Sequence, residues 1–339
     1  MMDKISNKSL AIIFSLIIIL IAAIILSFHL GRYPVPPKEL MGILLSRITP
    51  IEVFWTERME TVLFNIRLPR VILACLVGCC ISTAGAAYQG IFQNPMSSPD
   101  ILGASQGAAF GAALAIFNGL GSSLTTLSAF FFSLLTVALV YFMASRAKGS
   151  KVLGLILSGV MVSSLFSAGT SFIKLVADPT DQLPAITFWL MGSLSGANIK
   201  DIKFALLPMS LGMSILYLLR WQINVLTMGD DEARTMGVNA KAVRLLVIIS
   251  STLITATSVS VSGMIGWVGL VIPHLSRWLI GNNYKYLLPA TMLTGAIFLL
   301  IVDNVSRNLL ITEIPLGILT AFIGAPFFIY LITREEVKY

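Results

Sequence analysis

The segment MGDDEARTMGVNAKAVR, residues 228–244, gathers charges of both signs in a chain that is otherwise strongly apolar. Gly229 or Asp230 can cap a short helix, whose acidic first turn suits the positive end of the helix dipole. Gly237 can end that helix in the left-handed conformation, and Asn239 can cap the next one. The pattern predicts a helix-glycine-helix elbow that engages a partner protein. A merely solvated loop is the alternative.

Other motifs that would carry chemistry are missing from the sequence. It contains no G-x-x-x-x-G-K-[ST] phosphate loop, no H-E-x-x-H, no serine elbow and no cluster of histidine and cysteine. Its three cysteines, Cys75, Cys79 and Cys80, lie in one apolar run, where they behave as small buried side chains. We therefore expect no catalytic residue, no metal site, no cofactor bound by this chain and no enzymatic activity.

Ionisable groups inside apolar runs are few, and Asp303 is the main one. An ion-coupled carrier would need such groups near the middle of the membrane, where charge is costly and usually functional. Asp303 lies four residues before Arg307, so the two side chains can pair on one helix face. We favour this pair over a proton relay. An ion-coupled secondary transporter stays one alternative function of the chain, and a non-transporting membrane receptor or scaffold is another.

Composition sets the fold class. Hydrophobic residues make up 56% of the 339 residues and charged residues only 12%, with a mean hydropathy of +0.89. Ordinary globular domains carry about a quarter charged residues. The sequence predicts an all-α polytopic membrane protein that forms a single transmembrane domain over 1–339. About ten transmembrane helices are expected, near residues 9–30, 65–87, 101–117, 123–143, 152–174, 201–219, 243–261, 264–280, 287–306 and 316–333.

The distribution of basic residues predicts the topology. Placing both termini in the cytoplasm puts SRAKGSK, the elbow at 220–242, GNNYKY and the tail TREEVKY on the inside, as the positive-inside rule requires. The segment 31–63 then lies outside and suits an amphipathic surface helix. The first run is read as a retained span rather than a cleaved signal peptide. The net charge of +7 is spread over span ends, which argues against nucleic acid as a partner.

Two stretches resemble each other. STAGAAYQGIFQNP from Ser82 and SVSGMIGWVGLVIP from Ser260 both read Ser-x-x-Gly, with a proline ten residues after the glycine. Because their flanking spans run in opposite senses, the match indicates an inverted repeat. Two ordinary helix breaks explain it equally well.

Small residues recur on one predicted helix. The motif GASQGAAFG sets three glycines four residues apart, which allows close approach of helices in lipid. We expect packing rather than a direct pathway role for Gly103, Gly107 and Gly111.

Several longer blocks resemble the FecCD family, the permease subunits of ABC importers for iron-siderophores, haem and cobalamin. They cover roughly 60–334 in the family's order. The blocks are RLPRVILACLVGCCISTAGAAYQGIFQNPMSSPDILGASQGAAFGA, FWLMGSLSGA, MGDDEARTMGV, SGMIGWVGLVIPHLSRWLIG and DNVSRNLLITEIPLGILTAFIGAPFFIYL.

The resemblance implies a multi-pass subunit in a prokaryotic cytoplasmic (inner) membrane. It dimerises with a second copy or with a sister permease. Two ABC ATPase subunits, which bind the ATP and Mg, lie below it, and an extracytoplasmic binding protein lies above. The resemblance implies a metal chelate as substrate, an iron-siderophore or haem, with cobalamin or molybdate as alternatives in the same family.

The resemblance also implies residue roles. The arginines Arg67, Arg70 and Arg307 would meet acidic residues of the binding protein, and lipid phosphate is their simpler partner. Small residues around Gly85, Ala86 and Gly90 would give room for a pathway. Tyr88 and Ser306 depart from the family pattern, which leaves the coupling role of the elbow intact but bears on the pathway. The elbow residues that would dock into the ATPase are Gly229, Asp230, Glu232, Ala233, Arg234 and Gly237.

Overall fold

Each predicted apolar run forms a helix in the computed structural model, which describes residues 2–47, 49–50, 52–147 and 151–334. No strand occurs among these residues, which confirms the all-α class. The ten helices that match the runs are α1 (Met2–His29), α4 (Leu68–Ile91), α5 (Ala104–Phe117), α6 (Ser122–Arg146), α7 (Lys151–Val176), α9 (Ile199–Leu218), α12 (Ala240–Ser262), α13 (Val268–Ile280), α14 (Tyr284–Asn308) and α15 (Leu316–Arg334).

Short helices connect these spans or cap their ends. They are α2 (Pro37–Leu45), α3 (Glu57–Thr61), the π-helix η1 (Val62–Arg67), the 3-10 helix η2 (Pro99–Leu102), α8 (Gln182–Met191), α10 (Arg220–Leu226) and α11 (Asp230–Thr235). Parts of two stretches that the predicted topology places inside, 148–150 of SRAKGSK and 335–339 of TREEVKY, lie outside the described residues.

Helix α4 forms the centre of the bundle. It packs on α12, α13 and α14, and nearly every residue from Cys80 to Ile91 is buried. The close contacts depend on small residues: a Cβ placed on Gly78 would lie 2.2 Å from the carbonyl oxygen of Gly295 in α14. In lipid such contacts supply van der Waals energy that hydrophobic burial cannot. Helix α1 packs along α14 through Leu16.

Seven helical segments of the described chain are long and apolar enough to cross a membrane, and three further apolar helices are shorter. Two of the short ones, α5 and α13, have 14 and 13 residues. At 1.5 Å per residue each is about 20 Å long, less than the roughly 30 Å of a bilayer core. We infer that the segments before them, 92–103 (which includes the 3-10 helix η2) and 263–267, lie within the depth of the membrane.

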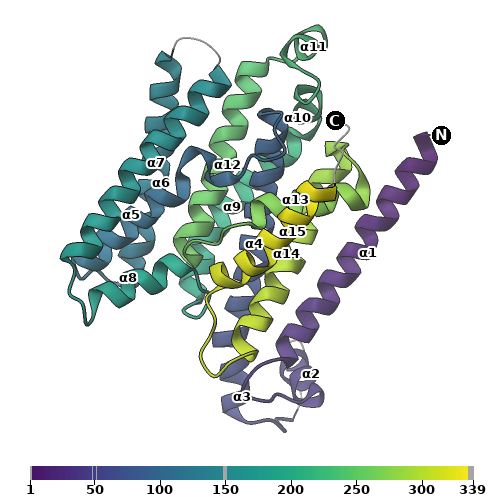
Figure 1. Cartoon of the computed structure of the whole chain (residues 1–339). Coiled ribbons are helices and arrows are strands. Elements are labelled where there is room, and N and C mark those ends of the chain that lie inside the picture. The colour runs from purple at the N-terminus through teal and green to yellow at the C-terminus, as the bar shows by residue number, and fades with distance from the viewer. Residues whose placement is uncertain (1, 48, 51, 148–150, 335–339) are drawn as a thin grey trace.

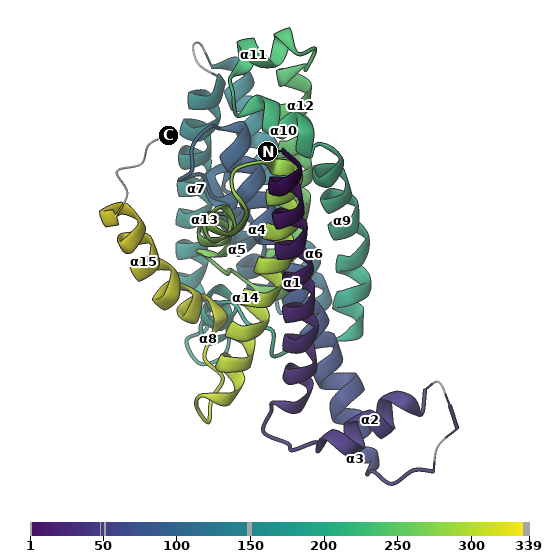
Figure 2. The ribbon, with the colours of Figure 1, turned by 90° about the vertical axis from the view of Figure 1, so that its right-hand side faces the viewer.

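The two ends of the bundle carry different structures. Helices α10 and α11 lie at one end of the bundle, the same end as the first residues of α1. Helices α2 and α3 project from the opposite end (Figures 1 and 2). The projecting segment has its own apolar cluster, and α2 exposes Met41, Leu44 and Leu45 on its other side. The apolar cluster consists of Val35, Leu40, Ile43, Trp55 and Leu63. The helix predicted within 31–63 is thus present as α2.

The two matching Ser-x-x-Gly stretches have different conformations. Gly85 lies inside α4, whereas Gly263 follows the last residue of α12 with a φ of 68°. The local match therefore does not mark equivalent positions, and the inverted repeat stays a prediction.

Candidate translocation and coupling sites

The predicted elbow is present between α10 and α12. Gly229 precedes α11 with a φ of 127°, and Gly237 follows it with a φ of 76°. Both values lie in the region that favours glycine. The Asn239 side chain accepts a hydrogen bond from the backbone N–H of Ala242 at 3.1 Å and so caps α12, as predicted.

One side of the elbow is anchored and the other is free to meet a partner. Ala233 is fully buried, and Arg244 of α12 pairs with Asp230 at 2.8 Å. The outward charges are much more exposed: the side chains of Asp231 and Arg234 expose 93% and 76% of their surface. The elbow is therefore a fixed element whose outer charges point into solvent.

A cavity of about 510 Å³ lies beside the elbow. Its walls come from the last turns of α6, the first turns of α7 and α12, and α11. Polar and charged residues line the elbow side, and the other side is apolar apart from Tyr141 and Ser145. The elbow side contributes Asp230, Arg234, Asn239, Lys241 and Arg244.

A second cavity, of about 700 Å³, opens where the helices are interrupted. Both irregular segments at membrane depth contribute to it: Asp100 comes from η2, and residues 264–267 from the α12–α13 connection. Such backbone is tolerated at this depth only where it is buried or lines a cavity. The other lining residues are Ser105, Gln106, Leu190, Met191, Gly317, Ile318, Ala321 and Phe322.

Close backbone contacts hold the interrupted segments in place. A Cβ on Gly269 of α13 would lie 2.5 Å from the ring of Pro99, and one on Gly85 would lie 1.8 Å from the carbonyl oxygen of Gly269. Trp267 has a φ of 70°, which is uncommon for a bulky residue and marks a strained position. Its side chain packs on Gly324 of α15. No local sequence pattern predicts this cavity, although the glycines and prolines beside it indicate helix breaks.

The six small residues predicted for pathway or packing all lie at helix contacts. Gly107 and Gly111 face the α6 backbone, with hypothetical Cβ atoms 2.5 Å from the carbonyl oxygens of Phe132 and Ser128 respectively. Gly103 has a φ of 78° and begins α5. The stretch with Gly85, Ala86 and Gly90 is buried among this chain's own helices. None of the six lines the 700 Å³ cavity in the described chain, and a pathway role for Gly85, Ala86 and Gly90 stays a prediction.

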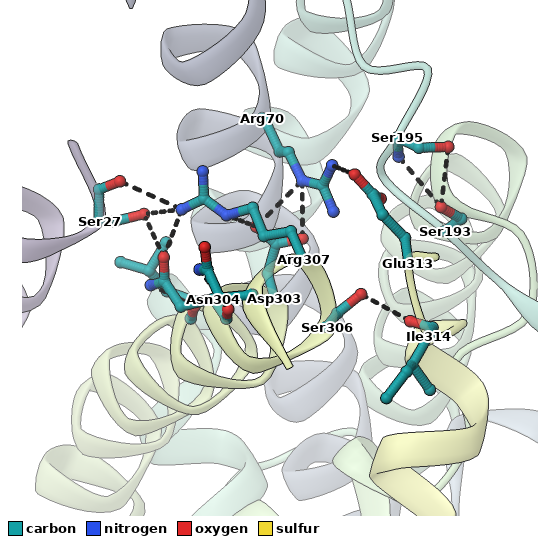
Figure 3. Close-up of polar contacts among 12 residues, drawn as sticks. Ser27, Arg70, Ser193, Ser195, Asp303, Asn304, Ser306, Arg307, Glu313 and Ile314 are labelled. Carbon is teal, nitrogen blue, oxygen red and sulfur yellow. Dashed lines mark hydrogen bonds and ion pairs between the residues drawn. The ribbon is translucent and has the colours of Figure 1, made fainter. Parts of the chain in front are cut away.

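At the opposite end, Arg70 of α4 joins two carboxylates (Figure 3). Its Nε donates to Asp303 at 2.9 and 3.1 Å, and its Nη1 donates to Glu313 at 2.9 Å. Arg307 lies 3.5 Å from the same Asp303 and donates to the Ser27 hydroxyl at 2.7 Å. The predicted pair of Asp303 and Arg307 is confirmed, but Arg70 is the closer partner. Asp303 is thus held between two arginines, and this pairing accounts for its charge without a proton relay.

Arg67 ends the π-helix η1, a type of helix that often marks functional sites. Its guanidinium donates to the backbone carbonyls of Phe28 and Tyr33. All three arginines predicted to meet a binding protein are therefore buried, exposing 3% (Arg67), 5% (Arg70) and 7% (Arg307) of their surface. Their docking role stays a prediction, because in this conformation their head groups bind inside the chain.

This architecture is that of a polytopic transport permease, and comparison with known proteins assigns the chain to that class. The profile of the FecCD transport family matches residues 19–334. The chain is 42% identical to the molybdate import system permease protein MolB of Haemophilus influenzae, over 95% of both chains. It is also 42% identical to a probable iron chelatin transport system permease protein of Helicobacter pylori, over 82% of this chain and 84% of the other.

A solved structure agrees with the sequence matches. The fold superposes with a TM-score of 0.86 on an inward-facing conformation of a metal-chelate type ABC transporter, at 40% identity over 96% of this chain and 99% of the other. The chain belongs to the FecCD transport family. It is the membrane subunit of an ABC importer and not an enzyme.

Proposed function

We propose that this chain translocates a metal chelate, an iron-siderophore or haem, across the cytoplasmic (inner) membrane of a prokaryote. Two separate ATPase subunits bind ATP and Mg and dock on the elbow, while an extracytoplasmic binding protein delivers the chelate at the α2–α3 end. Both termini lie in the cytoplasm. The working unit is a dimer with a second copy or a sister permease.

The elbow geometry carries this proposal. An anchored helix with exposed charges transmits a push from a partner, because Ala233 and the Asp230–Arg244 pair tie it to α12. Motion of α12 reaches the 700 Å³ cavity through the connection 263–267, which follows α12 directly. ATP-driven closure of the partners would then alternate access by shifting a two-state bundle.

The substrate assignment draws on the relatives. One is named for iron chelatin, one for molybdate, and the solved neighbour for metal chelates. A cavity of about 700 Å³ suits a chelate better than a small ion, since sites for drug-sized ligands measure roughly 300–1,000 Å³. A cobalamin or molybdate importer is the second candidate within the same family. The ion-coupled carrier is disfavoured, because Asp303 is paired with two arginines.

The first test is a pull-down of the tagged full chain from mild detergent, with co-purifying proteins identified by mass. Wild type should retain an ATPase that the elbow variant loses. The elbow variant is Asp230→Ala, Glu232→Ala, Arg234→Ala. A control variant with the same change in charge at the opposite end should behave like wild type. The control is Glu52→Ala, Glu57→Ala, Arg58→Ala. Absence of any ATPase from the wild-type dimer would contradict the proposal.

A further inference from the structure

Asp100 lines the 700 Å³ cavity and lies on the segment that connects α4 to α5. Because α5 has only 14 residues, this segment lies within the membrane layer. An ionisable residue at such depth is expensive and is usually retained for function.

The surroundings of Asp100 leave its charge facing the cavity. Its side chain is exposed and accepts a hydrogen bond from the hydroxyl of Ser105. It forms no ion pair within the described chain, in contrast to Asp303 and its two arginines. All other lining residues of the cavity are uncharged, and most are apolar.

A capping role explains only part of this arrangement. An acid beside the first turn of α5 does suit the helix dipole. However, the Asp100 carboxylate accepts its hydrogen bond from the Ser105 hydroxyl and not from a backbone N–H of α5. An uncharged Asn or Ser would serve the turn as well. The charge itself therefore needs a different explanation.

We propose that Asp100 gives the translocation cavity a cation-favouring electrostatic bias, so that the pathway admits neutral or positively charged metal chelates and disfavours small oxyanions. A single carboxylate among apolar walls acts through a low dielectric and is weakly screened. Clefts lined by one sign of charge change the local concentration of charged solutes by roughly tenfold or more. The inference rests on the proposed function and narrows it at the same site: an iron-siderophore of neutral or positive net charge fits the bias, whereas haem, with two propionate carboxylates, does not. It sets this chain apart from an importer of molybdate, a dianion.

The test measures charge selectivity without needing the natural substrate. Ala321 of α15 lines the same cavity. Ala321→Cys is introduced into the full-length chain, with the three native cysteines replaced by alanine, in lipid nanodiscs. The probes are two methanethiosulfonate reagents of similar size, one with a trimethylammonium group and one with a sulfonate. The measured quantity is the ratio of their modification rates, cationic over anionic.

Asp100→Asn should lower this ratio by about tenfold, and Asp100→Glu should preserve it. Asp231→Asn removes an equal charge from the distant elbow and should leave the ratio unchanged. Asparagine keeps the hydrogen-bonding shape, so a purely structural role of Asp100 would not move the ratio. An unchanged ratio in a folded Asp100→Asn protein, as judged by its elution as a single dimer peak, would overturn the inference.

Failure of this inference is separable from failure of the proposed function. If the ratio falls as expected but no ATPase co-purifies with wild type, the cavity is cation-biased and the importer proposal is wrong. If the ATPase co-purifies but the ratio is insensitive to Asp100→Asn, the importer stands and the charge bias is wrong.

Discussion

Arg70 and Asp303 form a buried ion pair that ties α4 to α14, with 2.9 Å between Arg70 Nε and the Asp303 carboxylate. Their side chains expose 6% and 0% of their surface. The pair lies among the hydrogen bonds of Arg307, Ser27 and Asn304, so several elements meet at this point. This cluster lies at the end of the bundle that carries α2 and α3 (Figures 1 and 3).

Removing the charge of Asp303 should destabilise the protein strongly. Asp303→Asn leaves Arg70 and Arg307 buried without their shared carboxylate, and breaking a buried pair typically costs about 3–5 kcal/mol. We expect a clear fall in the midpoint of thermal unfolding, measured in detergent by the loss of the dimer peak. Glu313→Gln removes the charge of the other partner of Arg70. The Glu313 side chain is 31% exposed, so this change should have a smaller effect. Equal midpoints for the two variants would contradict this ranking.

Gly85 should tolerate no side chain. A Cβ there would lie 1.8 Å from the carbonyl oxygen of Gly269, so Gly85→Ala forces α4 and α13 apart. Overpacking of this kind costs about 1–3 kcal/mol, and the shift would also disturb the segment that lines the cavity. Gly196→Ala is the matched control, since nothing lies within 4 Å of its Cβ position. Unfolding midpoints of the two variants decide the question, and similar values would argue against the contact.

The elbow should depend on the backbone conformation at Gly237. Its φ of 76° is accessible to Gly and Asn but strained for a β-branched residue, by roughly 1–2 kcal/mol. Because nothing lies within 4 Å of a Cβ there, the effect comes from the backbone alone. Gly237→Val should reduce the amount of ATPase retained in the pull-down, whereas Gly237→Asn should retain most of it. Full retention by Gly237→Val would mean that the turn is not needed for docking.

The position of Trp267 should control the shape of the central cavity. Gly324 of α15 lies against its ring, with a hypothetical Cβ 2.6 Å from Trp267 Cβ. Gly324→Val should displace the indole into the cavity and slow modification of Ala321→Cys by both thiol reagents alike. The double variant with Trp267→Ala should recover the rate. A rate unaffected by Gly324→Val would show that the ring does not border the open space.

Local patterns in the sequence were sufficient for the helices and the elbow. Runs of apolar residues determine spans, because a backbone in lipid must satisfy its hydrogen bonds within one segment. Gly237 and Asn239 determine the turn and the cap, since a positive φ and an N-cap hydrogen bond involve only residues within one turn of each other. The pairing of Asp303 with Arg307 was predictable for the same reason, the two being four residues apart.

The remaining features were decided by the tertiary structure. Arg70 and Asp303 are separated by 233 positions, and Arg70 and Glu313 by 243, so no local spacing could join them. The burial of the three arginines depends on how α1 and α14 pack beside α4. The cavity, with Asp100 and Trp267 in one wall, exists because two short helices leave irregular segments side by side at membrane depth. Hydropathy and capping act within a helical turn, whereas these sites depend on which helices pack together and at what height.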